Sequence, residues 1–494
     1  MNEGRNLSKN PLFYIVIAAF VLIAVFIFEL VRLNVLPLGI LIGVIAILFI
    51  LIGLTAFCLI GKKSGKVKKI IGIVMAFILA IVSGFGSFYL NVTYDSLSMM
   101  NSANAKEKKI TSVYVLDNGV FENVNELDGH EIGIMTNFEN SKGASEISKR
   151  LHRRGIEVKY EKYESGIKMV KDLKGQAIDA IICDTSFLAT IEDFEEEKEI
   201  RSQIKSLLDY EYYVEKTKEN KEEVNVTNTP FSVMISGIDT YGDIETTSRS
   251  DVNIIATINP ETRRILLVSI PRDYYVETRC ESGAGCAYGK KDKLTHTGLH
   301  GIETTEATLE NLFDMTINYN ARVNFSSVVS IVDEIGGVDV NNPYEFSIGN
   351  HYFPQGPIHL NGEQALAFSR ERYSFVEGDR ERGRNQMRVM NGIIQKIVSP
   401  QMLKNFSGIM NAIGNSFQTN MSVQDMMALV NMQLTKGGTW SVYFCSVNGT
   451  GGTDFAYELG DNAYVMYPDE KTIVHAKENM SAIQNGDIPP YVNQ

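Results

Sequence analysis

Three nearly uninterrupted apolar runs lie within the first 92 positions of the chain. Each is close to the roughly 20 residues that an α-helix needs to cross a bilayer. A signal peptide can imitate the first run but not three in succession, and no small-residue cleavage site follows it. The pattern predicts a membrane region, 1–94, with transmembrane helices at about 12–33, 36–60 and 70–92.

The charges between these runs predict the orientation of the chain. The loop 61–69, GKKSGKVKK, carries five lysines and no acid, and the N-terminal tail carries Arg5 and Lys9. The short connection after the first helix has Arg32 as its sole charge. Because lysine-rich loops stay cytoplasmic, we expect a multi-pass protein of the cell membrane with a cytoplasmic N-terminus and extracellular domains after about Asn91.

Short strands and helices alternate in the next segment, 95–225. The runs SVYVL, EIGIM, EVKYEKY and AIDAIICD are typical of strands, and ASEISKRLHRRG predicts a helix that ends at Gly155. The segment has no glycine-rich phosphate loop, nucleophile elbow or metal-ligand spacing. It therefore predicts a small accessory α/β domain for binding or spacing, followed by a polar linker over 215–230.

A second α/β unit, 226–494, follows the linker. The pattern predicts a mixed central sheet flanked by helices. The predicted strands are 231–239, 252–258, 264–270 and 440–447, and the predicted helices are 302–313, 324–334, 386–398 and 423–434.

Composition adds two constraints. With 494 residues and 44% hydrophobic residues the chain is long and apolar enough for several cores, and its formal net charge is -12. Cys58, Cys183 and Cys445 lie in apolar runs, where free thiols are expected. Cys280 and Cys286 flank a short polar loop on the expected outer side, where the spacing is compatible either with a disulfide or with free thiols.

Charged groups stand where three predicted strands of the second unit stop. Asp239 follows the first strand, Arg249 and Asp251 precede the second, and Arg272 follows the third. Each alone is typical of a solvated turn. Together they favour a site, because ligands gather at strand ends in α/β sheets.

An arginine cluster lies downstream, in SRERYSFVEGDRERGRNQ at 369–386. It holds five arginines and four carboxylates in 18 residues. Gln386 is expected to open a helix with an apolar face, whose first turn would favour an anion. Since guanidinium groups pair with phosphate oxygens, a diphosphate is the favoured ligand. The alternative is a surface ion-pair network among Arg370, Arg372, Arg380, Arg382 and Arg384 and the acids Glu371, Glu377, Asp379 and Glu381.

Two carboxylates beside a phosphate require a cation between them. Mg²⁺ typically binds through one or two carboxylates together with phosphate oxygens. Asp239 and Asp251 are therefore the candidate Mg²⁺ ligands, and the composite site suits phosphoryl transfer.

At these residues the sequence resembles the LytR–CpsA–Psr family of cell-wall enzymes, over roughly 231–400. The similarity runs through GIDTYGDIETTSRSDVNIIATINPETRRILLVSIPRD, KLTHTGLHG, NFSSVVSIVDEIGGVDV and LNGEQALAFSRERYSFVEGDRERGRNQ. Three membrane helices and an extra module are similar to its CpsA/Wzg branch. That branch's accessory domain is similar to a DNA-polymerase processivity fold, but an extracellular position implies no nucleic acid.

The resemblance implies transfer of a capsular or related wall polysaccharide from an undecaprenyl-diphosphate carrier to peptidoglycan. It implies that Asp239 and Asp251 bind Mg²⁺, and that Asp379 is a candidate base for the acceptor hydroxyl. It also implies catalytic roles for Arg272, Arg370 and Arg382, and leaves the role of Lys293 open. The residues expected to hold the diphosphate are Arg249, Arg272, Arg370, Arg372, Arg382 and Gln386.

A lipid carrier also needs an apolar channel. The candidates on the predicted helix 324–334 are Phe325, Val328, Val329, Ile331 and Val332, for which ordinary core packing is the alternative. Tethering would raise the local concentration of a lipid substrate. Two other functions stay open: a lipid diphosphatase, and a non-catalytic regulator of polysaccharide assembly that contacts other membrane proteins. A DNA-binding factor is excluded, since it requires a basic cytoplasmic domain.

Overall fold

A computed structural model gives the arrangement of the chain. The structure describes residues 10–33, 36, 38–61, 65–101, 106–215, 223–238, 244–280, 286–399 and 417–492. Asp239, one of the predicted metal ligands, lies outside the described residues.

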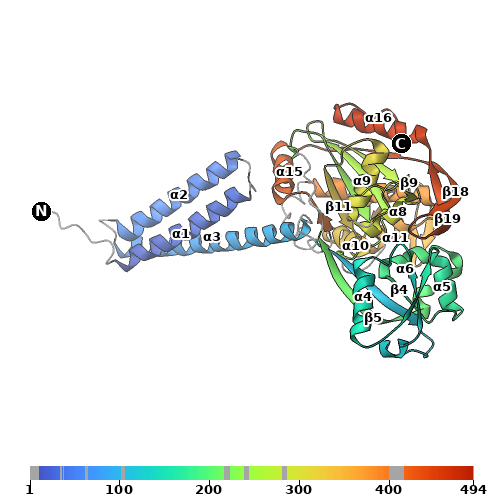
Figure 1. Ribbon diagram of the computed structural model, residues 1–494. Helices are drawn as coiled ribbons and strands as arrows, with labels where there is room; N and C mark the ends of the chain where they lie inside the picture. Colours follow the sequence, from blue (N-terminus) through green and yellow to red (C-terminus); the bar gives the residue numbers. More distant parts are fainter. Residues whose placement is uncertain are drawn as a thin grey trace.

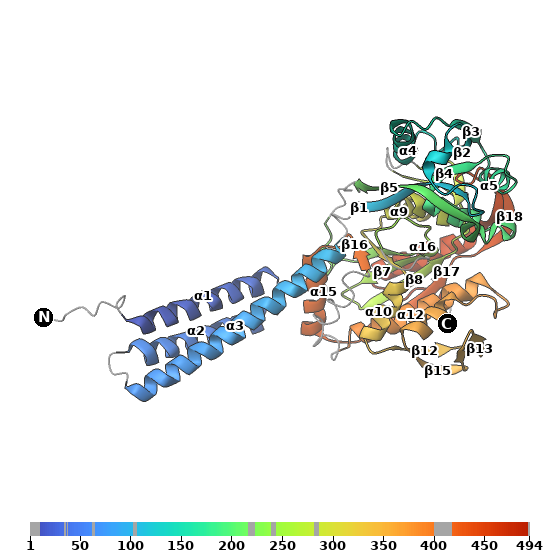
Figure 2. The same ribbon diagram turned by 90° about the horizontal axis from the view of Figure 1, so that it is seen from below.

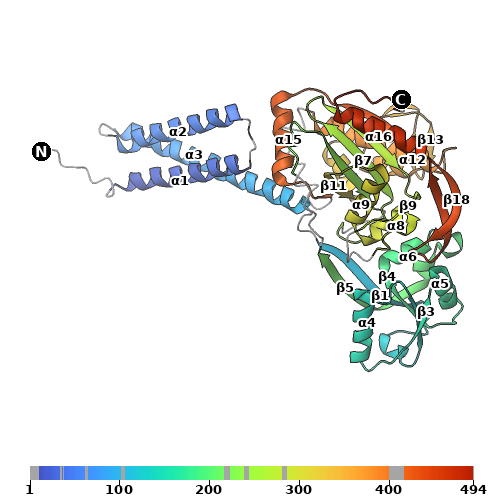
Figure 3. The same ribbon diagram turned by 45° about the horizontal axis from the view of Figure 1, so that its top comes forward.

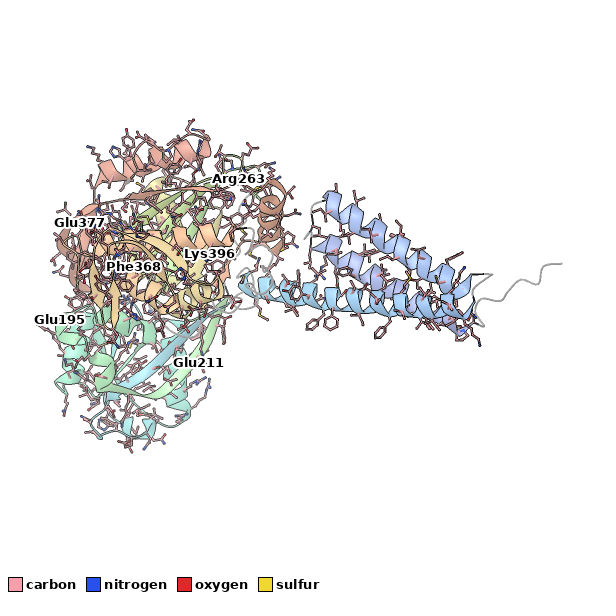
Figure 4. All side chains as sticks on the ribbon, turned by 180° about the vertical axis from the view of Figure 1, so that it is seen from behind. Glu195, Glu211, Arg263, Phe368, Glu377 and Lys396 are labelled. Atoms are coloured by element: carbon pink, nitrogen blue, oxygen red, sulfur yellow. A yellow bond between two sulfur atoms is a disulfide. The ribbon has the colours of Figure 1, made fainter. Side chains whose placement is uncertain are left out.

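Three long apolar helices form a bundle at the N-terminal end (Figure 1). They are α1 (Pro11–Arg32), α2 (Leu38–Ile60) and α3 (Lys66–Met100). Among the described residues, these three are long and apolar enough to cross a membrane. Most of their large apolar side chains are exposed in the structure, as expected of surfaces that face lipid. Figure 4 shows such side chains projecting outward along all three helices.

The third helix is longer than the predicted span 70–92. It starts at Lys66 and continues to Met100, so the predicted domain limit after residue 94 falls inside it. Its last turns carry an apolar pair, Leu97 and Met100, which is buried in a cluster of the second α/β unit. The continuous apolar run stops where the helix is expected to leave the lipid. The helix itself continues, because its last turns pack against the second α/β unit.

The accessory domain is built on a five-stranded sheet in the order β3-β2-β4-β1-β5. The strands β2, β3 and β4 are parallel, whereas β1 is antiparallel to its neighbours β4 and β5. The predicted strands are present, but β5 was not predicted from the sequence. The elements are β1 (Lys106–Leu116), β2 (Glu131–Met135), α4 (Lys142–Arg153), β3 (Lys159–Tyr163), α5 (Gly166–Lys174), β4 (Ala180–Asp184), α6 (Thr185–Ile191) and β5 (Ile204–Glu215).

The second unit has a six-stranded mixed sheet in the order β16-β11-β6-β7-β8-β17. Figure 2 shows the accessory domain at one end of this unit and two small pairs of strands at the other. These pairs are β12 (Val338–Asn342) with β15 (Gly356–Leu360), and β13 (Phe346–Ile348) with β14 (His351–Phe353). The six strands are β6 (Phe231–Gly237), β7 (Val252–Asn259), β8 (Arg264–Ile270), β11 (Tyr319–Val323), β16 (Phe417–Thr419) and β17 (Ser441–Ser446).

Helices cover both faces of this sheet because neighbouring residues of its strands point to opposite faces. Ile255 and Leu266 pack under α9 (Ile302–Phe313) and α16 (Glu470–Gln484). Ile254 and Leu267 pack on the other face, under α12 (Asp379–Ile397) and α15 (Val423–Lys436). A further layer, α10 (Phe325–Glu334) and α11 (Gly362–Arg370), packs around Val332 and Phe368. The α/β architecture with a mixed sheet is thus confirmed.

The three cysteines in apolar runs are free as expected, and the structure decides the question that the sequence left open for the other two. Cys280 and Cys286 form a disulfide. Cys58, Cys183 and Cys445 are free. The one pair that was predicted to lie in a polar outer loop is therefore the bonded pair.

Candidate functional site

Strand direction brings the predicted site residues to one edge of the large sheet. β6, β8, β11 and β17 all run the same way, so their carboxyl ends share this edge, and antiparallel β7 begins there. Asp251 immediately precedes β7, and its backbone N–H donates to Gly237 O at 2.9 Å. Gly237 and Ile238 are the last described residues before Asp239. The edge thus collects groups that are far apart in the sequence.

Asp251 lies between two guanidinium groups. Its Oδ1 accepts hydrogen bonds from Arg272 Nη1 at 2.8 Å and from Thr295 Oγ1 at 2.9 Å. Its Oδ2 is 3.7 Å from Arg249 Nη2. A backbone hydrogen bond of 2.8 Å from Thr295 N to Arg272 O links α8 (Leu294–Thr297) to the end of β8. Asp251, Arg249 and Arg272 therefore form one charged cluster.

These neighbours control the ionisation of the cluster. Burial alone would raise the pKa of Asp251, but Arg249, Arg272 and Arg382 outweigh it and hold the pKa far below its usual range. Burial would lower the pKa of Arg272, but Asp251 and Asp273 raise it well above normal. Asp251 and Arg272 therefore stay charged at neutral pH, so the cluster keeps both a fixed negative and a fixed positive charge.

The helix that carries the arginine cluster begins earlier than predicted. It starts at Asp379 instead of Gln386, so Arg382 lies within its first turns. Gly378, with φ 53°, provides the turn that precedes it, and Asp379 and Glu381 favour a helix N-terminus. An added Cβ at Gly383 would lie 2.7 Å from Ser269 Oγ, so glycine allows the helix to approach the end of β8. This approach brings Arg382 to Asp251.

The five clustered arginines divide between two roles. Arg384 pairs with Glu377 and, at 2.6 Å, with Glu381, so it belongs to an ion-pair network. Arg380 donates to Gly449 O at 3.0 Å.

The other three arginines, Arg370, Arg372 and Arg382, line a cavity together with Gln386. Arg370 stacks on the Phe325 ring at 4.1 Å, and Arg382 contacts Asp379 at 2.5 Å. The ion-pair interpretation is therefore confirmed for Arg384, whereas diphosphate binding by Arg370, Arg372 and Arg382 stays a prediction.

The cavity has a volume of about 940 Å³ and joins a charged mouth to an apolar interior. The charged part of the lining consists of Arg249, Asp251 and Arg272 together with Arg370, Arg372 and Arg382, and we call this part the mouth. The apolar part lies between α10, α11, α12 and the sheet, and it is lined by Phe325, Val328, Val329, Leu366, Met390 and Ile393.

Two of the five predicted channel residues are not part of this lining. Phe325, Val328 and Val329 line the cavity, whereas Ile331 and Val332 are buried in the cluster under α11. The helical repeat turns residues 331 and 332 away from the face shared by 325, 328 and 329. For these two residues the expectation of core packing was the correct one.

The structure adds three polar residues that had no predicted role. Thr295 binds Asp251, and Lys293 contacts Asp273 at 2.7 Å. Both lie in the KLTHTGLHG motif, which was the available signal. Asp193, from the accessory domain, also lines the cavity. It stands in the acid-rich run EDFEEEKE, where nothing distinguishes it from its neighbours.

The described part of the site provides one of the two predicted metal carboxylates. No group of three His, Cys, Asp or Glu side chains able to hold a metal occurs among the described residues. Such a group is not required, because Mg²⁺ takes one or two carboxylates and completes its shell with phosphate and water. Asp251 suits this role: one oxygen is held by Arg272 and Thr295, and the other lies beyond hydrogen-bond length from Arg249.

Comparisons with known proteins agree with the motifs. The chain is 38% identical over 216 residues to the polyisoprenyl-teichoic acid–peptidoglycan teichoic acid transferase TagU of Enterococcus faecalis, covering 43% of this chain and 68% of that protein. The TagU of Bacillus cereus is 37% identical over 215 residues, with coverage of 43% and 67%. Among solved structures, B. subtilis TagV aligns with 26% identity and a TM-score of 0.44, covering 53% of this chain and 99% of that one. The profile of the LytR_cpsA_psr family matches residues 201–482, more than half of the sequence, and the chain is a member of that family.

Proposed function

We propose that this protein transfers a glycopolymer from a polyprenyl diphosphate carrier to peptidoglycan. The observation that carries the proposal is the continuity of the cavity, from the mouth at Arg249, Arg272 and Arg382 to the apolar space beside Val328 and Met390. One ligand class has a multiply charged anion joined to a long hydrocarbon: a lipid diphosphate. The relatives' names, polyisoprenyl-teichoic acid–peptidoglycan teichoic acid transferase, describe a donor and acceptor of this kind.

The reaction is a phosphoryl transfer. The acceptor hydroxyl oxygen attacks the phosphorus that carries the glycan, and the bond from that phosphorus to the bridging oxygen breaks. Polyprenyl phosphate leaves, and the hydroxyl proton passes to Asp379, which lies on the first turn of α12 beside Arg382. Arg249, Arg272 and Arg382 hold the negative charge that moves onto the leaving group.

Magnesium completes the proposal. Asp251, with the predicted ligand Asp239, would hold Mg²⁺, which would neutralise diphosphate charge and polarise the phosphoryl group. Chelation of Mg²⁺ is expected to abolish transfer by the full chain, and added Mg²⁺ to restore it. Transfer that persists at full rate in excess chelator would remove the metal from the proposal.

The membrane helices suit a donor whose tail lies in the bilayer. We propose a cytoplasmic N-terminus and an extracellular site, in agreement with the Lys-rich loop 61–69 and with the Cys280–Cys286 disulfide, which suits an oxidising compartment. Protease added to intact cells is then expected to digest the part after Met100. Protection of this part would reverse the orientation.

The transfer itself is tested with the full chain in detergent, a polyprenyl-diphosphate-linked glycan and peptidoglycan. We expect glycan on peptidoglycan and free polyprenyl phosphate in equal amounts, and loss of both with Arg382→Ala. Lipid hydrolysis alone, even with acceptor present, would identify a diphosphatase.

Capsular and teichoic donors offered in parallel identify the polymer, and we propose a capsular or related wall polysaccharide. Unchanged wall-attached polymer in cells carrying Arg382→Ala would favour a regulator.

A further inference from the structure

The accessory domain places a carboxylate inside the cationic mouth of the cavity. Asp193 lies on the connection between α6 and the short helix η4 (Glu195–Glu197). Its Oδ1 is 2.8 Å from Arg249 Nη1 and 3.4 Å from Arg272 Nη2, and its Oδ2 is 3.5 Å from Lys293 Nζ. One anionic side chain thus contacts three cations, although it comes from another part of the chain.

We propose that Asp193 stands in for a phosphate group of the donor. Its carboxylate occupies the place of one phosphate of the diphosphate between Arg249, Arg272 and Lys293, and it leaves when the diphosphate binds. The donor and the α6–η4 connection therefore exclude each other from the mouth. This inference rests on the proposed function, since it takes the donor to be a diphosphate.

Unsatisfied donors show that the carboxylate is an incomplete ligand. Arg249 Nη1 and Arg272 Nε are buried and have no hydrogen-bond acceptor among the described residues. The contact of Asp193 with Arg249 is close in distance but lacks hydrogen-bond geometry. The two phosphates of the donor offer four non-bridging oxygens in tetrahedral arrangements, where a carboxylate offers two oxygens in a plane. Because unpaired buried donors are costly, exchange of carboxylate for phosphate is favoured.

Charge balance also argues against simultaneous occupancy. Three cations and three carboxylates are paired at the mouth: Arg249, Arg272, Lys293, Asp193, Asp251 and Asp273. With Asp193 in place these six groups sum to zero charge, and without it the remaining five carry one positive charge, which complements the negative charge that a bound diphosphate adds. Burial would raise the pKa of Asp193, but Arg249, Arg272 and Lys293 lower it to about 2. Protonation therefore cannot relieve the repulsion at neutral pH, and displacement can.

The displacement requires only a short segment to move. The accessory domain is held elsewhere, by the 2.7 Å ion pair between Glu107 and Arg322 and by the hydrogen bond from Thr247 N to Lys108 O. Figures 1 and 3 both show α6 next to α8, where the connection reaches the site. Figure 4 labels Glu195, just after Asp193, at the edge where the two domains meet.

The inference is tested with farnesyl diphosphate, a short polyprenyl diphosphate. The deciding observation is whether Asp193→Asn raises or lowers the affinity for this ligand. Calorimetric titration of the full chain in detergent is expected to show at least about 5-fold tighter binding for Asp193→Asn, the lower limit of typical coupling between sites. The matched control is Glu195→Gln, whose side chain is 87% exposed and pairs with Lys198, and it should leave the affinity unchanged. Unchanged or weaker binding by Asp193→Asn overturns the inference, and weaker binding would make Asp193 a positioning residue for Arg249.

A second measurement uses the wild-type chain and does not depend on the variant's folding. Farnesyl diphosphate is expected to accelerate amide hydrogen exchange in 191–195, because the connection is released. Unchanged or slower exchange overturns the inference. If neither the wild type nor Asp193→Asn binds farnesyl diphosphate, the proposed function fails too. Binding without the predicted gain in affinity or exchange overturns the role of Asp193 alone.

Discussion

At the scale of single residues, Asp251 and Asp379 have different surroundings, which suit the two different roles that we propose for them. Asp251 is buried among Arg249, Arg272 and Arg382, which keep it ionised and suit it to hold a cation. Asp379 has Arg382 as its charged partner and lies beside a small second cavity at the start of α12. In the proposed mechanism Asp379 takes the acceptor's proton, while the arginines around Asp251 hold the donor.

Asp379→Asn tests this division. Because the proposed base is lost while Arg249, Arg272 and Arg382 remain, we expect kcat of transfer to fall by about 10²–10⁴-fold with little change in donor affinity. Steady-state kinetics with varied donor, together with farnesyl diphosphate titration, measures both. A parallel loss of affinity and rate would show instead that Asp379 acts by holding Arg382 in place.

The contact made by Asp193 also predicts a pH dependence of stability. Its pKa is about 2 in the folded chain against an ordinary 3.8. A lowered pKa means stabilisation that is complete above the ordinary value and is lost as pH falls through the folded value. The wild type should therefore lose its difference in thermal midpoint from Asp193→Asn only between about pH 4 and pH 2. A difference that already shrinks between pH 7 and pH 5 would contradict this.

At the scale of elements, the periodicity of the sequence predicted most strands and helices correctly. The predicted apolar runs match four strands and one helix, because each of these elements buries apolar residues at the spacing typical of its type. The elements are β2, β6, β7, β8 and α9. The failures lie where polar residues form regular structure. The first turns of α12 are charged because they line a site, and half of β5 (204–215) is exposed or polar, so neither shows an apolar pattern.

A buried ion pair between side chains of β1 and β11 connects the two domains. Glu107 on β1 contacts Arg322 on β11 at 2.7 Å, and both side chains are almost completely buried. Among the described residues no other carboxylate is paired with Arg322. Loss of one partner leaves a buried charge, so we expect Glu107→Gln to lower the free energy of unfolding by about 3–5 kcal/mol.

Urea unfolding of the full chain in detergent measures this effect, and β5 offers the control. Glu211 pairs with Lys108 at 3.0 Å, but its side chain is 55% exposed. Figure 4 labels Glu211 on the accessory domain. Glu211→Gln should change stability by less than about 1 kcal/mol. Equal effects of the two substitutions would show that the Glu107–Arg322 pair does not hold the domains together.

At the scale of the whole molecule, the sequence predicted the parts but not their contacts. Motifs predicted Arg249, Asp251, Arg272 and Arg382 as site residues, and the structure brings these four together around one cavity. The participation of Asp193 could not be predicted, since a contact between domains leaves no periodicity in either of them.

For the same reason, the sequence did not predict the contact between the end of α3 and the helices around the cavity. Leu97 at the end of α3 is 0% exposed and shares a cluster with Val332 and Phe368, which support α10 and α11 around the cavity. The membrane helix and the cavity wall are thus one packed unit. The cavity therefore keeps a set orientation relative to α3, and under the proposed function also relative to the bilayer that would hold the donor's tail.

Leu97→Ala tests whether α3 is part of the outer domain or only a tether. If it is part, the substitution creates a cavity beside Phe368 and should lower the free energy of unfolding by about 2–5 kcal/mol. Met99, 61% exposed on the same turn, is the control, and Met99→Ala should cost less than about 0.5 kcal/mol. Urea unfolding of both variants in detergent gives the values. If α3 is only a tether, the two substitutions should change the free energy of unfolding equally. If α3 is part of the outer domain, only Leu97→Ala should lower the free energy of unfolding, and it should also lower transfer from a bilayer-embedded donor.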